Sequence, residues 1–182
     1  MAVGSALRKN LVFWHWYPDL LVQDLSPEQL RWQPDGHDTS ILFALWHTYR
    51  AADELCHGLV LGRPSVFADG GWSARLPVAQ TGASPFGNGL TREQIGRLDL
   101  DIGELSAYAK AVGASIADGL AGLSDAQASE EISLPFFTGV YPNVDRVTRL
   151  EAITFFAIGH TAEHLGEVQF LKGLMGLKGA PL

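Results

Sequence analysis

Two histidines near the C-terminus are the clearest candidates for chemistry in this chain. His160 and His164 are four residues apart in the run AIGHTAEHLGE. Because residues i and i+4 lie on the same face of a helix, both imidazoles can reach a single ion. Neutral imidazole is a common protein ligand for zinc, nickel, copper and iron. The pair therefore predicts a metal site on a helix.

The residues around this pair favour metal ligation over a simple hydrogen-bonded pair, which is the alternative. Positions spaced by three and four along the helix are apolar at both ends and ionisable in the middle: Leu150, Ile153, Ala157, His160, His164, Glu167, Leu171 and Leu174. The histidines are thus expected on a buried stripe, where polar groups need partners. Glu167 is the candidate catalytic residue, able to orient a ligand imidazole or accept a proton, and Glu54 is a weaker candidate for a supporting role.

A catalytic metal site typically has three protein ligands and an open position, so a third ligand is needed. His47 lies within a predicted helix, and its stripe contains small residues such as Ala44 and Ala51, which leave room for an ion with bound water. The other histidines fit less well: His37 lies in a turn, His57 faces another side of the helix, and His15 is among large aromatics. We therefore predict the ligands His47, His160 and His164.

The composition limits the kinds of partner. The chain has 182 residues and a formal net charge of -7. This length fits one domain, residues 1–182, and the charge argues against nucleic acid or an anionic membrane as partner. Cys56 is the single cysteine, expected as a buried thiol, which agrees with a reducing, cytoplasmic location. No apolar run is long enough to cross a bilayer, so small molecules are the expected partners.

Helix-start signals and apolar spacing predict an all-α fold, a four-helix bundle. The expected helices cover about 5–24, with a kink or break at Pro18, about 40–61, 91–120 and 148 to 173–176, with a short turn after Ser26. We find no convincing strand pattern. The helical spacing instead accounts for most of the chain.

Two segments do not fit the helical pattern. Residues 62–89 form a long irregular loop between the second and third helices, rich in Gly, Ser and Pro. Since aromatic residues interrupt this loop, we expect it to be ordered, to pack over the bundle and to form the rim of the pocket. Residues 128–147 contain the aromatic runs LPFF and YPN, which either cover the core or contact a substrate.

Beyond these patterns, the chain resembles the DinB-like superfamily of metalloproteins. The resemblance rests on the loop WQPDG, the helix start TSI, His47 and the last-helix run HTAEHLGEVQFLKG, and it covers nearly the whole chain. It implies a four-helix bundle, a zinc or nickel ion on His47, His160 and His164, and assembly as a homodimer. Some relatives are transferases or isomerases that use mycothiol, bacillithiol or glutathione.

Two functions are therefore open. In the first, the metal activates a low-molecular-weight thiol for attack on an electrophile, as in a thiol S-transferase or isomerase. In the second, the site is a non-catalytic, structural or sensory metal centre. The run HTAEH also matches the H-x-x-E-H motif of zinc proteases, with Glu163 as general base, but the short chain after His164 leaves little room for a peptide-binding domain.

Overall fold

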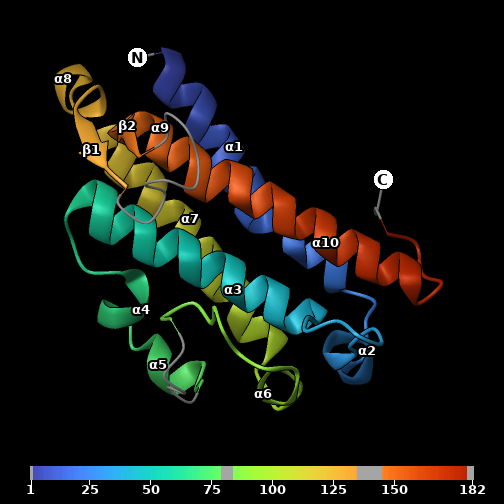
Figure 1. The fold of residues 1–182 in the computed structure, drawn as a ribbon. Coiled ribbons are helices and arrows are strands. Elements are labelled where there is room, and N and C mark those ends of the chain that lie inside the picture. Colours follow the sequence, from blue (N-terminus) through green and yellow to red (C-terminus); the bar gives the residue numbers. More distant parts are fainter. Residues whose placement is uncertain (1, 79–83, 135–144, 180–182) are drawn as a thin grey trace.

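The computed structural model describes residues 2–78, 84–134 and 145–179. Four long helices run side by side: α1 (Ala2–Val22), α3 (Ile41–Glu54), α7 (Ile102–Gly122) and α10 (His160–Leu174). Helix α1 packs against α7, and α3 packs against α10, as Figure 1 shows. The predicted all-α four-helix bundle is confirmed, and the pairing of α3 with α10 brings the candidate ligands to one interface.

Shorter elements connect the long helices. They are α2 (Pro27–Arg31), the π-helix η1 (Leu55–Leu61), α4 (Val66–Asp69), α5 (Trp72–Arg75), α6 (Arg92–Gly96), α8 (Asp125–Ala128), α9 (Arg149–Ile153) and the π-helix η3 (Thr154–Gly159). The turn predicted after Ser26 is α2, with Ser26 and Gln29 forming a capping box. The second predicted helix begins at Ile41 after the N-cap Ser40 and continues as η1 to Leu61.

Pro18 does not break the first helix, which is continuous from Ala2 to Val22. A proline cannot donate a hydrogen bond to the carbonyl four residues earlier, here that of Trp14. The Tyr49 hydroxyl on α3 donates to this carbonyl instead, at 3.3 Å. A bond from another helix thus replaces the missing intrahelical bond, which explains why the predicted break is absent.

The predicted helix at 91–120 is wrong in one respect, because it is two helices. Helix α6 ends at Gly96, and α7 begins at Ile102. The Asp101 side chain accepts a hydrogen bond from the Glu104 amide and so caps α7. The apolar residues between the helices, Leu98 and Leu100, are buried in the core without being helical, so apolar spacing alone did not distinguish them from a helix.

The expectation of no strands was also wrong. Strand β1 (Glu131–Ser133) pairs antiparallel with β2 (Arg146–Thr148), and Ile132 lies opposite Val147. Three-residue strands are too short to show an alternating pattern. Leu134 is buried in the core, whereas the aromatic residues predicted to cover the core or a substrate lie outside the described residues.

The histidine helix begins as predicted, with Thr148 and Glu151 in a capping box, and ends at Leu174 before Gly176. It is not regular, because the π-helix η3 lies directly before His160. Wide turns of this kind occur often at functional sites. Here the wide turn sets the helical register of the two histidines that follow it.

The long loop packs on the bundle through a buried ionic cluster. Asp53 is fully buried, and its carboxylate accepts hydrogen bonds from the amides of Val66 and Phe67 at 2.9 and 2.8 Å and from the Tyr108 hydroxyl at 2.6 Å. The Arg50 guanidinium lies 3.8 Å above the Phe67 ring. The start of the loop is therefore attached to α3 and α7, as expected from its aromatic residues.

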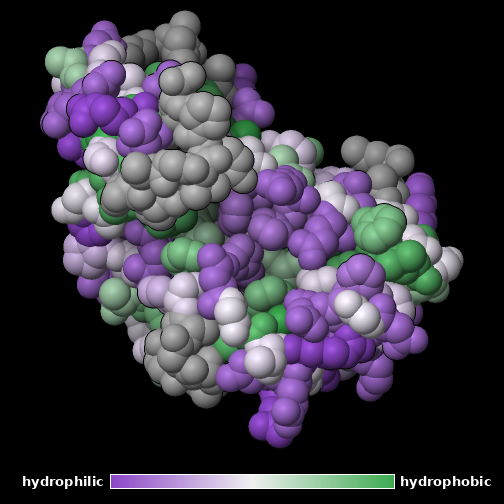
Figure 2. Space-filling model, viewed as in Figure 1, coloured by the Kyte–Doolittle hydropathy of each residue, from purple (hydrophilic) through white to green (hydrophobic). Residues whose placement is uncertain are grey.

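Hydrophilic side chains cover much of the face seen in Figure 2, and the hydrophobic side chains on it lie in small separate groups. One such group lies over the C-terminal part of α10, where Phe170 and Leu174 are exposed. In the described part of the chain, no helix is both long and apolar enough to cross a membrane.

Candidate metal centre

The structure brings His47, His160 and His164 together at the interface of α3 and α10. One ring nitrogen from each lies within 4.8 Å of the others. The Nε2 atoms of His160 and His164 are 3.2 Å apart. Two nitrogens bound about 2.1 Å from one tetrahedral ion lie about 3.4 Å apart. The pair on α10 thus already has ligand spacing, and a small approach by His47 would complete a three-nitrogen site.

A carboxylate orients the His164 ring. Its Nδ1 lies 2.8 Å from Oε2 of Glu167, and Oε1 of Glu167 accepts a hydrogen bond from the Thr39 hydroxyl at 2.6 Å. An imidazole that donates from Nδ1 keeps its Nε2 lone pair free for an ion, and metal-bound histidines usually have such a partner. Because both of its oxygens are engaged, Glu167 is placed to position His164.

A backbone carbonyl orients His47 in the same way. Its Nδ1 lies 2.7 Å from the carbonyl oxygen of Phe86, in the loop that follows α5. The next residue, Gly87, has a φ of +89°, and a Cβ there would overlap the Trp46 ring on α3. Only glycine fits this left-handed, closely packed position without strain. Gly87 therefore allows the carbonyl to reach the histidine.

The histidines lie at the edge of the buried stripe, which corrects the predicted seam. On α10 the buried positions are Thr161, Leu165, Val168, Leu171 and Lys172, while Leu174 is half exposed. His160 and His164 are half-buried and face α3, where His47 is buried. This edge position lets an ion contact all three rings and still be reached from outside.

Burial keeps two of the imidazoles neutral. It lowers the pKa of His47, and it lowers that of His160 to about 3, helped by the neighbouring histidines. Burial alone would raise the pKa of Glu167, but hydrogen bonds from His164 and Thr39 lower it overall. Near pH 7 His47 and His160 are therefore neutral nitrogen donors, and the Glu167 carboxylate beside the cluster is ionised. Neutral imidazole nitrogen is a donor that zinc or nickel favours.

A cavity of about 340 Å³ opens beside His47 and His164. The other residues that line it are Asp38, Thr39, Phe43, Gly87, Asn88, Gly89, Leu90, Ile95 and Glu167. The room beside His47 thus comes from Gly87 and Gly89 of the loop. This corrects our expectation that the small residues of α3 would provide it. The predicted place of the loop at the pocket rim agrees with its residues 87–89.

A family model described as the DinB superfamily matches residues 19–168 of the chain. The chain belongs to the DinB superfamily. A solved structure of a conserved protein from Enterococcus faecalis has the same fold, with a TM-score of 0.77, 18% identity, and coverage of 97% of this chain and 99% of that one. No curated protein matches the chain.

The other histidines of this DinB-superfamily chain lie apart from the cluster. His37 is exposed in its turn. His57 is buried between Asp53, at 2.7 Å, and the Ser115 hydroxyl, at 2.8 Å. His15 is buried against α7, and its Nδ1 contacts the Leu11 carbonyl at 2.9 Å. The structure brings none of these three to the cluster.

Glu54 does not support the ligands, and that expectation is wrong. Its carboxylate pairs with Arg50 at 2.8 Å and accepts a hydrogen bond from Ser65 at 2.9 Å, at the far end of α3. Thr39 and the Phe86 carbonyl, which hold Glu167 and His47, were not predicted from the sequence. Thr39 was considered only as a helix start, and Ser40 fills that role, which leaves the Thr39 hydroxyl free for Glu167.

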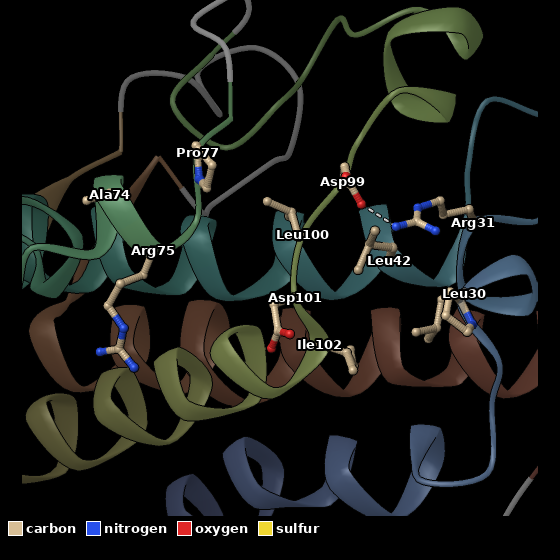
Figure 3. Close-up of a pocket in the computed structure, with 11 residues that line it drawn as sticks. Leu30, Arg31, Leu42, Ala74, Arg75, Pro77, Asp99, Leu100, Asp101 and Ile102 are labelled. Atoms are coloured by element: carbon tan, nitrogen blue, oxygen red, sulfur yellow. Dashed lines mark hydrogen bonds and ion pairs between the residues drawn. The ribbon is translucent and has the colours of Figure 1, made fainter.

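A second cleft, of about 500 Å³, lies near α2, α5 and the start of α7 (Figure 3). Its floor is apolar, with Leu42 and Leu100, and at one end Arg31 pairs with Asp99. None of the three clustered histidines lines it. The cavity beside His47 is therefore the better candidate for a reactive site.

Proposed function

We propose that the chain binds one divalent transition metal ion, zinc or nickel, through His47, His160 and His164. The observation that carries the proposal is the convergence of three ring nitrogens within 4.8 Å, with the Nδ1 atoms of His47 and His164 each held by an acceptor. Three neutral imidazoles fit either ion and leave at least one position open.

We further propose that this position binds a low-molecular-weight thiol and that the protein is a thiol S-transferase or isomerase. A bound ion would supply Lewis acidity, which lowers the pKa of the thiol. The chain itself would orient the ligands through Glu167 and Phe86 and admit the thiol through the cavity. Cys56 does not suit the role of nucleophile, since it is fully buried and burial raises the pKa of its thiol.

Elemental analysis tests the metal site. Protein expressed in metal-supplemented medium and purified without chelator should contain about one equivalent of a divalent metal per chain, as expected for one site of three ligands. The His160→Ala/His164→Ala double variant should contain almost none. Wild-type metal content in that variant, or almost no metal in the wild type, would contradict the proposal.

A thiol panel tests the reaction. Mycothiol, bacillithiol, glutathione and coenzyme A would be added to cobalt-loaded protein, and sulfur ligation followed by the charge-transfer spectrum and by X-ray absorption. Turnover with reactive electrophiles would then be measured for each thiol that binds. If no thiol binds and none turns over, the non-catalytic reading, a structural or sensory metal centre, is the better one.

The proposal also includes a homodimer located in the cytoplasm. Val12, Phe13 and Trp16 expose a strip of apolar surface on α1, and an interface between two chains would cover such a strip. Sedimentation equilibrium of the wild type and of a Trp16→Glu variant tests the dimer, since a charge in the interface should favour the monomer.

A further inference from the structure

We propose that the cavity beside the histidine cluster selects thiols that carry a positively charged group, such as an ammonium, over thiols that carry carboxylates. This inference rests on the proposed thiol ligation and adds the charge of the substrate to it. It depends on the charges that surround the cavity, on which of them are already engaged, and on the charge that a thiolate would add.

The charged side chains that line the cavity are acidic. Of the residues that line it, Asp38 and Glu167 carry carboxylates, and the described lining contains neither Lys nor Arg. The Phe43 ring also lines the cavity and lies 5.8 Å from the His47 ring. A ligand carboxylate would find no cationic partner among these side chains.

Arg92, a basic residue that contacts the loop before α3, is engaged by backbone carbonyls. Arg92 donates hydrogen bonds to the carbonyls of Pro34, at 2.7 Å, and Gln33, at 3.3 Å, and also to the carbonyl of His37. These bonds hold the guanidinium against the loop before α3, and Arg92 does not line the cavity. Arg92 therefore organises the loop that carries Asp38 and does not serve as an anion-binding group.

Asp38 is the carboxylate that remains available. Glu167 uses both oxygens for Thr39 and His164, whereas Asp38 is exposed and has no hydrogen bond or ion pair with the residues that the structure describes. A divalent ion on three neutral imidazoles is balanced by these two carboxylates, and a bound thiolate makes the whole site negative. A cationic group on the thiol restores neutrality, while a carboxylate adds further repulsion.

Three small thiols on cobalt-loaded protein provide the test: cysteamine, 2-mercaptoethanol and 3-mercaptopropionate. Each is titrated at low ionic strength, and the dissociation constant is taken from the sulfur-to-cobalt charge-transfer band. Because the thiols differ in their own acidity, the decisive quantity is the change that a variant causes in the ratio of the cysteamine to the mercaptopropionate constants. The intrinsic differences between the thiols cancel when the ratio of the variant is compared with that of the wild type.

Relative to 2-mercaptoethanol, Asp38→Asn should weaken cysteamine and strengthen 3-mercaptopropionate, each by about threefold, the effect of one unit charge about 6 Å away in a water-like dielectric. The ratio should then change by about tenfold, because the effect of the lost charge on the thiolate is common to all three thiols and cancels in the ratio. Asp69→Asn is the matched control, since it removes the same charge from an exposed residue of α4 outside the cavity. High salt should reduce the wild-type preference.

The outcomes separate the two proposals. If all three thiols give the band but the ratio is the same in Asp38→Asn and the wild type, charge selection is overturned and thiol ligation stands. If no thiol gives the band in metal-loaded wild type, both are overturned. Metal content is measured for each variant, and Asp38→Ser, which should give the same change in ratio, replaces Asp38→Asn if that variant loses its metal.

Discussion

Replacing Glu167 by Gln should weaken metal binding about tenfold while leaving the fold intact. Glu167 accepts hydrogen bonds from His164 at 2.8 Å and from Thr39 at 2.6 Å. Glutamine has the same shape and can still accept from His164 through its oxygen, but it carries no charge. The variant therefore changes the strength of the contact more than its geometry.

The magnitude follows from the kind of hydrogen bond lost. A hydrogen bond to a charged group contributes about 1.5–3 kcal/mol and a neutral one about 0.5–1.5, so the substitution removes about 1–1.5 kcal/mol, or about a factor of ten in affinity. Glu167→Ala removes both bonds and should cost up to about 100-fold, the upper range for partners of metal ligands. Thr39→Val keeps the carboxylate and should cost only about threefold, because Thr39 acts on the ligand only through Glu167 and water at the exposed edge of the site can replace its hydroxyl as a donor.

The assay is competition with a chromophoric chelator at a pH near 7.5, with circular dichroism as a check on folding. Glu163→Gln is the control, because Glu163 is exposed on the same helix and lies between the two histidines in sequence. It removes the same charge without touching a ligand. Glu167→Gln with wild-type affinity, or an equal loss in Glu163→Gln, would refute the positioning role. The function of Glu167 as a proton acceptor remains a separate prediction.

Three further predictions concern other residues. His47→Ala should lower metal affinity by more than about 100-fold, more than the loss of a supporting partner costs, whereas His37→Ala should not alter it; equal effects in a chelator competition would contradict the choice of ligand. Asp53→Asn should destabilise the fold by about 3–5 kcal/mol in urea unfolding, because it leaves buried donors unpaired, without changing the metal content of the folded protein. His15 has a pKa of about 4, below its ordinary 6.5, because it is buried. As the pH falls, the unfolded chain therefore binds a proton at His15 before the folded protein does. The contribution of neutral His15 to the free energy of unfolding is complete above pH 6.5 and decreases by up to about 3 kcal/mol towards pH 4. A His15→Leu variant should lack that part of the slope, and an unchanged slope would contradict the assignment.

The parts of the structure that the sequence predicted are those set by local rules. Helix starts at Ser26, Ser40 and Thr148 follow from capping side chains a few residues away. The pairing of His160 with His164 follows from the helical repeat alone. His47 required a comparison among the remaining histidines, which are in a turn, on another helix face or among aromatics. The structure brings His47 beside the other two, and its role as a ligand stays a prediction.

The parts that the sequence did not predict depend on contacts between distant residues. The Phe86 carbonyl that holds His47 is a backbone atom, so no side-chain pattern marks it. Thr39 and Glu167 are separated by 128 positions, and the Tyr49 hydroxyl that supports the helix at Pro18 comes from another helix. Glu54 was misplaced for the same reason, since its partners Arg50 and Ser65 are defined by the fold of the loop.

The two supports of the candidate ligands come from segments before and after α3 in the sequence. Thr39 lies just before this helix and acts on His164 through Glu167, while Phe86 follows it by a long loop and acts on His47 directly. From its place at the rim of the cavity, the loop should affect the choice of electrophile more than metal affinity. The contact between the Phe86 carbonyl and His47 connects the choice of electrophile with the metal affinity. A movement of the loop that widened the cavity would also release His47. Two changes to the loop should separate these effects. Removing loop residues before Ser84 should lower the metal affinity, because it disturbs the Phe86 carbonyl. Substituting Asn88, which lines the cavity, should change only which electrophiles the cavity admits.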